Sequence, residues 1–80
     1  MRLSLITFGI ARDICGQQVL ELEVPDNATA GYLRELLMET YPPLERLASF
    51  QLAVNQEFAE DDAPLSPQDE VALIPPVSGG

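Results

Sequence analysis

The chain has 80 residues, a formal net charge of −9 and 46% hydrophobic residues, which is the composition of one small folded domain and not of a disordered segment. An acidic chain has no cationic surface that displaces counterions from phosphates, so general nucleic-acid binding is excluded and a basic protein partner is favoured. No apolar run is long enough to span a membrane and no basic-then-apolar leader opens the sequence, so we expect a cytoplasmic protein.

The sequence is poor in the side chains that enzymes use. It has no His and no Lys, and Cys15 is its single cysteine, which we interpret as a small buried hydrophobic residue. A hydrolytic triad needs a base that titrates near neutral pH, and a zinc site or an internal disulfide needs more ligands or a second thiol. We therefore expect no bound metal or cofactor and no enzymatic activity of the chain on its own.

The first third of the chain predicts two strands around a short helical turn. Residues 2–8 alternate apolar and polar side chains, as a half-buried strand does, and residues 17–24 repeat that pattern more clearly. Between them, residues 10–15 favour one helical turn that Gly16 ends.

Residues 29–41 predict the main helix. Thr29 is a suitable N-cap, and the helix ends before Pro42-Pro43 because a proline disfavours a helical residue in front of it. Its apolar side chains repeat with helical spacing on one face, at Leu33, Leu36, Leu37 and Tyr41.

The second half predicts three further strands, at residues 50–54, 57–59 and 70–74, with a turn at Asn55-Gln56. The acidic residues 60–62 read as a solvated turn and not as a metal site. The order β-β-α-β-β-β predicts an α+β domain over residues 1–74, with one main helix on one face of a mixed sheet of about five strands. We expect its core to contain Leu3, Leu5, Leu20, Leu22, Phe50, Leu52, Val54, Val71 and Leu73.

Residues 75–80 predict an extended tail, Pro75-Pro76-Val77-Ser78-Gly79-Gly80. The two prolines stiffen the exit from the last strand, and six residues reach at most ~20 Å. Glycines carry no Cβ, so such a tail can place the Gly80 carboxylate inside a narrow slot on another protein. A carboxylate is a poor acyl donor, and it becomes a good one when a separate ATP-using enzyme converts it to an acyl-adenylate.

Four stretches resemble the MoaD-type sulfur carriers, the small subunits of molybdopterin synthase within the ubiquitin-like β-grasp proteins. They are FGIARDIC at residues 8–15, AVNQ at 53–56, DEVA at 69–72 and PPVSGG at 75–80. The chain departs from that family at Gln68, where a glycine is frequent, which puts the turn type there in question.

The resemblance implies a ubiquitin-like β-grasp fold and a role as a sulfur carrier. An adenylating enzyme would use ATP to activate Gly80, and a sulfurtransferase would supply the sulfur that makes Gly80 a thiocarboxylate. The tail, through residues Pro75, Pro76, Val77, Ser78 and Gly79, would then enter the large synthase subunit. There the sulfur would pass to cyclic pyranopterin monophosphate during molybdenum cofactor biosynthesis, in a heterotetramer around a large-subunit dimer.

Strand alternation also predicts a surface for a partner. If Leu3 and Leu5 face the core, Phe8 faces outward, and the same reasoning turns Ile74 outward, while Phe58 lies on a short edge strand. An exposed apolar patch beside a projecting tail favours partner binding by Phe8, Phe58 and Ile74. The alternative is that Phe8 and Phe58 cap the core. Arg12 can pair within the chain or contact a partner, and the sequence does not choose.

Other functions fit the same tail. The chain can be a sulfur carrier for thiamine or amino-acid biosynthesis, although such carriers usually lack PPV before the glycines. It can be a ubiquitin-like modifier joined to target lysines, or an acidic interaction module whose tail has no role.

Overall fold

The computed structural model describes residues 1–46 and 50–75 of the chain. In chain order the elements are β1 (Arg2–Thr7), α1 (Gly9–Cys15), β2 (Val19–Glu23), α2 (Ala30–Thr40), the 3-10 helix η1 (Pro42–Arg46), β3 (Gln51–Val54), β4 (Glu57–Phe58) and β5 (Val71–Ile74).

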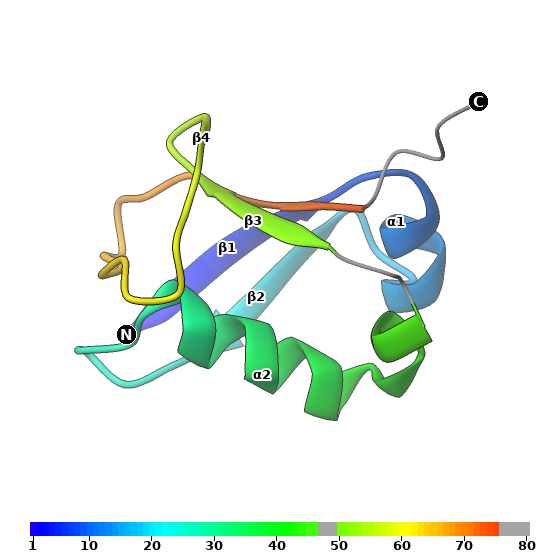
Figure 1. Ribbon diagram of the computed structural model, residues 1–80, viewed down its shortest axis with the longest axis horizontal. Coiled ribbons are helices and arrows are strands. Elements are labelled where there is room, and N and C mark those ends of the chain that lie inside the picture. The colour runs from blue at the N-terminus through cyan, green and yellow to red at the C-terminus, as the bar shows by residue number, and fades with distance from the viewer. Residues whose placement is uncertain (47–49, 76–80) are drawn as a thin grey trace.

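The five strands form one mixed sheet in the order β2-β1-β5-β3-β4. The central pair, β1 and β5, is parallel, and each of the other neighbouring pairs is antiparallel. Helix α2 lies across one face of the sheet, while α1 and η1 lie at one end of it (Figure 1). The α+β prediction, with five strands and one main helix on one face, is therefore confirmed.

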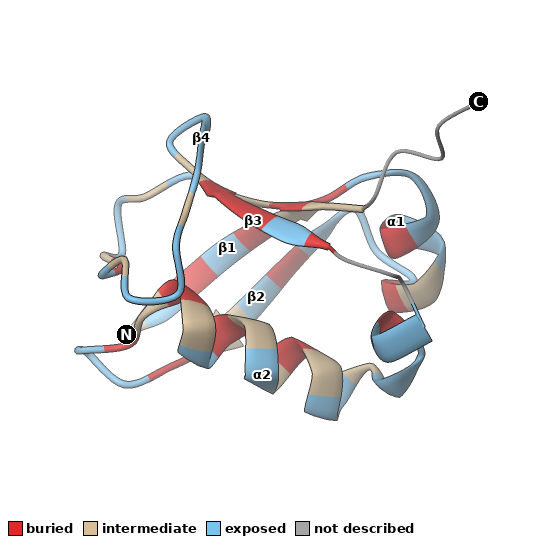
Figure 2. Ribbon diagram, in the orientation of Figure 1, coloured by how far each residue is buried: buried red, intermediate tan, exposed pale blue. Residues whose placement is uncertain are grey.

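The core lies between α2 and the sheet, as the buried residues of both layers show (Figure 2). Most of the predicted core residues are buried, and the predicted residues Leu22, Leu36, Tyr41 and Val54 are partly buried and pack against the core. The sequence did not indicate Leu44 and Leu65, which are also buried. Thr7 is a buried polar residue, and its Oγ1 donates to the Gln17 carbonyl oxygen at 2.6 Å, so its hydroxyl is satisfied.

Both ends of α2 follow from the sequence. The Thr29 hydroxyl oxygen accepts a hydrogen bond from the Tyr32 amide at 3.2 Å, which is the predicted N-cap. The helix ends at Thr40, before Pro42-Pro43, as expected. The two prolines then begin η1, a 3-10 helix that the sequence analysis missed, because proline is tolerated in the first turn of a helix.

Helix α1 is longer than the single turn that the sequence predicted. It begins at Gly9, which has φ +55°, and ends against Gly16, which has φ +79°. The amide of Gly16 donates to the Arg12 carbonyl oxygen at 2.8 Å, which is the left-handed helix ending that glycine favours.

The start of α2 is held by the acidic loop. The Ala30 amide donates to the Ala63 carbonyl oxygen and the Gly31 amide to the Asp61 carbonyl oxygen, both at 2.9 Å. These bonds satisfy amides that a helix start leaves without partners inside the helix. A Cβ on Gly31 would lie 3.0 Å from the Asp61 carbonyl oxygen, which is a tight contact, so a larger residue here would require the loop to move by a few tenths of an ångström.

Candidate docking face and tail exit

The sheet face opposite α2 carries a continuous apolar row. Paired residues in neighbouring strands point to the same face, so the register places one side chain from each strand in line. The row runs across all five strands as Val19, Ile6, Ala72, Ala53 and Phe58. Val19 and Phe58 are exposed at its ends. A sheet face that is only solvated is normally polar, so this face has the character of a binding surface.

A hollow of about 300 Å³ opens in this face, lined by Phe8, Ala53, Gln56, Phe58, Glu70, Ala72 and Ile74. It unites Phe8, Phe58 and Ile74, the three residues that the sequence analysis selected for partner binding. Phe8 is 47% exposed and Phe58 is 69% exposed, so neither caps the core. Large apolar side chains exposed around a hollow are suited to anchor a partner protein.

Asn55 fixes the turn between β3 and β4, which contributes Gln56 to the lining of the hollow. Asn55 and Gln56 have φ values of 54° and 73°, and this pair of left-handed residues forms the two-residue hairpin turn between β3 and β4 that the sequence predicted. The Asn55 Nδ2 donates to Asp69 Oδ1 and its Oδ1 accepts from the Glu70 amide, each at 3.0 Å. Its backbone amide donates to the Glu70 carbonyl oxygen at 2.8 Å. Asn55 therefore joins the AVNQ and DEVA motifs.

Gln68, where the sequence departs from the family pattern, lies in a turn between Ser66 and Asp69. The Asp69 amide donates to the Ser66 carbonyl oxygen at 3.1 Å, which closes a turn with Gln68 inside it. Among the described residues, the positions other than glycine with positive φ are Asn55 and Gln56, so Gln68 has a conformation that any residue adopts.

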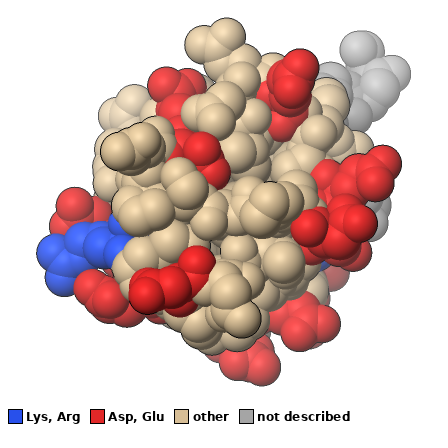
Figure 3. Space-filling view, turned by 90° about the vertical axis from the view of Figure 1, so that its left-hand side faces the viewer, with Lys and Arg blue, Asp and Glu red and all other residues tan. Residues whose placement is uncertain are grey.

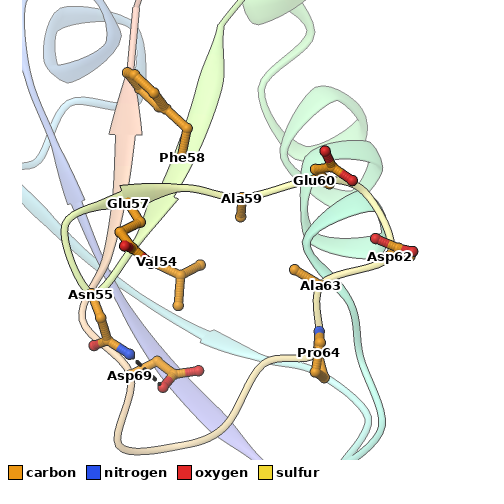
Figure 4. Close-up of a pocket in the computed structure, with 10 residues that line it drawn as sticks. All are labelled: Val54, Asn55, Glu57, Phe58, Ala59, Glu60, Asp62, Ala63, Pro64 and Asp69. Carbon is orange, nitrogen blue, oxygen red and sulfur yellow. Dashed lines mark hydrogen bonds between the residues drawn. The ribbon is translucent and has the colours of Figure 1, made fainter.

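A second, more polar hollow of about 460 Å³ lies beside β4. Figure 4 shows its lining, with Asn55 and Asp69 on one side and Glu60 and Asp62 on the other. Asp and Glu residues are spread over this end of the molecule, and a basic residue is plainly visible in this view only at one edge (Figure 3). No group of three or more metal-ligating side chains forms a metal site in residues 1–46 and 50–75.

The tail begins next to α1. Because β1 and β5 run parallel with Thr7 opposite Leu73, the chain leaves β5 beside the Phe8-Gly9 segment. A Cβ on Gly9 would lie 3.7 Å from the Pro75 Cγ, which is ordinary contact distance. The hollow, which includes Ile74, is thus contiguous with the tail exit. The remaining predicted tail residues, Pro76, Val77, Ser78, Gly79 and Gly80, lie outside the described residues.

Cys15 and Arg12, which the sequence analysis also considered, lie outside the lining of the apolar hollow. Cys15 is buried with 8% of its surface exposed, as predicted, and burial raises the pKa of its thiol. A thiol with a raised pKa is a weak nucleophile near neutral pH, so Cys15 fits a packing role. Arg12 is exposed, and none of the ion pairs found among the described residues includes it. Within residues 1–46 and 50–75, no helix is long and apolar enough to cross a membrane.

Comparison with known proteins places the chain in a family. The model of the ThiS family matches residues 5–80. The molybdopterin synthase sulfur carrier subunit of Arabidopsis thaliana is 35% identical over 81 residues, which span all of this chain and 84% of that protein. The subunit of the same name from Mycobacterium tuberculosis is 35% identical over 82 residues, which span all of this chain and 99% of that protein.

Solved structures of similar proteins have the same fold as this chain. SAMP1 from Haloferax volcanii has a TM-score of 0.83 and 27% identity, with all of both chains covered. A complex of subunits 1 and 2 of the molybdopterin-converting factor from Helicobacter pylori contains a chain with a TM-score of 0.68 and 26% identity, again over the whole of both chains. With the ubiquitin-like β-grasp fold, and with molybdopterin synthase sulfur carrier subunits as homologues over its whole length, this chain is a member of the ThiS family.

Proposed function

We propose that this chain is the sulfur carrier subunit of molybdopterin synthase. The observation that carries the proposal is the 35% identity to such subunits over the full length of the chain. The PPVSGG sequence and the family match through residue 80 support it. The apolar hollow beside the tail exit also supports it, because a carrier must dock before its tail can react.

In this proposal the chain contributes its last carbonyl carbon and no catalytic side chain. An adenylating enzyme joins the Gly80 carboxylate to the AMP part of ATP and releases pyrophosphate. Sulfur at the oxidation level of sulfide, supplied by way of a sulfurtransferase, attacks the Gly80 carbonyl carbon as the bond to AMP breaks. AMP leaves, and Gly80 becomes a thiocarboxylate, which is a stronger nucleophile than the carboxylate. The thiocarboxylate then donates its sulfur to cyclic pyranopterin monophosphate in the large subunit. The chain is thus the sulfur-donating, non-catalytic part of a sulfurtransferase.

The loading step is tested by intact-mass measurement. The protein is incubated with ATP, an adenylating enzyme of this family and a sulfur donor, and the product is then digested and sequenced by mass spectrometry. We expect the mass gain of one sulfur for one oxygen, located at Gly80. A variant that lacks Gly79 and Gly80 is the control and should gain nothing. A gain of sulfur at Cys15 instead, or no gain in the complete chain, would contradict the proposal.

The docking step is tested by substitutions in the hollow. The complex of two subunits from Helicobacter pylori suggests that this chain likewise binds a large subunit. A charge placed among apolar side chains must be desolvated on binding, so Phe58→Glu and Ile74→Glu should weaken binding to the large subunit by about tenfold or more. Tyr32→Glu, an exposed aromatic residue on α2, is the matched control and should bind as the wild type does. Unchanged affinity in both hollow variants would refute this role.

The likeness to SAMP1 favours a second function, that of a protein modifier. The same activated Gly80 carbonyl can acylate a lysine amine in place of sulfur. The chain contains no Lys, so lysine-linked polymers of the chain itself cannot form. Covalent conjugates in a cell lysate that disappear when Gly79 and Gly80 are deleted would favour this function.

A further inference from the structure

Two neighbouring carboxylates of the DEVA motif lie in different surroundings. Asp69 is partly buried, and both of its oxygens are occupied within the fold. Its Oδ1 accepts from the Asn55 Nδ2 at 3.0 Å and its Oδ2 accepts from the Ser66 amide at 2.8 Å. Charge-assisted bonds of this kind hold a loop in place. Asp69 therefore has a structural role.

Glu70 is held by its backbone and leaves its carboxylate free. Its amide and carbonyl group both bond to Asn55, at 3.0 and 2.8 Å. The next residue, Val71, is fully buried, so strand alternation turns Glu70 to the outer face of the sheet, where it lines the apolar hollow. Among the residues that the structure describes, no hydrogen bond or ion pair engages the Glu70 carboxylate.

Glu70 is the one carboxylate among the described residues that line this hollow. The other polar lining residue, Gln56, is neutral, while Glu57, Glu60 and Asp62 line the separate hollow beside β4. A single negative charge in the lining of an apolar hollow, on a backbone held by two hydrogen bonds, favours one arrangement of apolar and charged groups on the partner that binds there.

We propose that Glu70 selects a partner that presents an arginine or lysine directly beside the apolar side chain that enters the hollow. The proposal rests on the proposed function, under which that partner is the large synthase subunit. The net charge of −9 attracts a basic partner over a distance, and Glu70 pairs with its cation at contact. A charge pair at the rim of an interface raises the association rate and fixes the orientation of the partner, and its effect weakens as salt rises.

The test compares two variants that change the net charge equally. Glu70→Gln keeps the size of the side chain and removes its charge from the hollow. Glu39→Gln removes the same charge from α2, on the opposite face of the sheet. Both are measured against the purified large subunit by surface plasmon resonance over a range of salt concentrations. We expect Glu70→Gln to raise the Kd about five- to tenfold and to flatten its salt dependence, with the change from Glu39→Gln staying within about twofold.

A charge reversal sharpens the result. Glu70→Arg should weaken binding more than Glu70→Gln, because it places two cations in contact. The thermal midpoints of both Glu70 variants should equal that of the wild type, since the Glu70 bonds to Asn55 come from its backbone.

Sulfur loading at Gly80 and wild-type binding to the large subunit are measured first, which separates the two claims. If the wild type loads and binds but Glu70→Gln behaves as Glu39→Gln does, the inference about Glu70 is wrong and the proposed function stands. If the wild type does not bind the large subunit, the proposed function fails and this inference fails with it.

Discussion

Substitution of Asn55 should separate the two ways in which this residue stabilises the fold. Asn55→Gly keeps the left-handed backbone at φ 54° but removes the side-chain bonds to Asp69 and to the Glu70 amide. Both bonds are exposed to solvent, so each contributes about 0.5 kcal/mol, and the glycine variant should lose about 1 kcal/mol of unfolding free energy. Asn55→Ala loses the same bonds and also puts alanine, which tolerates a left-handed backbone less well than asparagine or glycine, at this position; this adds about 1 kcal/mol, for a total of about 2 kcal/mol.

The measurement is urea denaturation followed by circular dichroism, with thermal melts in parallel. In a domain of this size 1 kcal/mol shifts the thermal midpoint by about 4–8 °C, so the order should be wild type, then Asn55→Gly, then Asn55→Ala. Equal midpoints for the two variants would show that the backbone conformation adds nothing. Unfolding free energies for both variants within about 0.5 kcal/mol of the wild type would show that the link between the AVNQ and DEVA motifs does not stabilise the fold.

Three more outcomes follow from the fold. Gly31→Ala should lower the unfolding free energy by about 1 kcal/mol despite the better helix propensity of alanine, because its Cβ meets the Asp61 backbone at 3.0 Å; an equal or higher denaturation midpoint would contradict this. Thr29→Ala should cost about 1 kcal/mol through loss of the N-cap bond, whereas Thr29→Ser should retain most of it. The Cys15 thiol, whose pKa burial raises, should resist iodoacetamide at pH 8 in the native protein and react after unfolding in urea; equal rates in both states would refute its burial.

The strands and the main helix could be predicted because their apolar side chains repeat with the period of each element. Alternation turned Phe8 and Ile74 outward, and helical spacing set the buried face of α2. The 3-10 helix was missed because Pro42-Pro43 signals an end, while the burial of Leu44 depends on packing against elements distant in the sequence. Local sequence patterns therefore predict helices and strands, but they do not predict contacts between elements that are distant in the sequence.

The candidate site could be predicted only in part for the same reason. The sequence selected Phe8, Phe58 and Ile74 as separate outward residues, but the hollow that unites them depends on the order and register of four strands, β1, β5, β3 and β4. The different roles of Asp69 and Glu70 depend on contacts with Asn55, more than ten residues away along the chain. The DEVA motif contains both carboxylates, but the sequence alone does not show which of them accepts hydrogen bonds within the fold.

The position of β5 governs how the chain can fold during synthesis. Strands β1 and β2 form one half of the sheet and β3 and β4 the other, and β5 alone joins them. Until residues 71–74 have left the ribosome, the growing chain has two separate strand pairs, and the core that β5 helps to form cannot be completed. The complete sheet therefore forms only after β5 is available. Because β5 also lines the apolar hollow, a partner cannot dock there before that point.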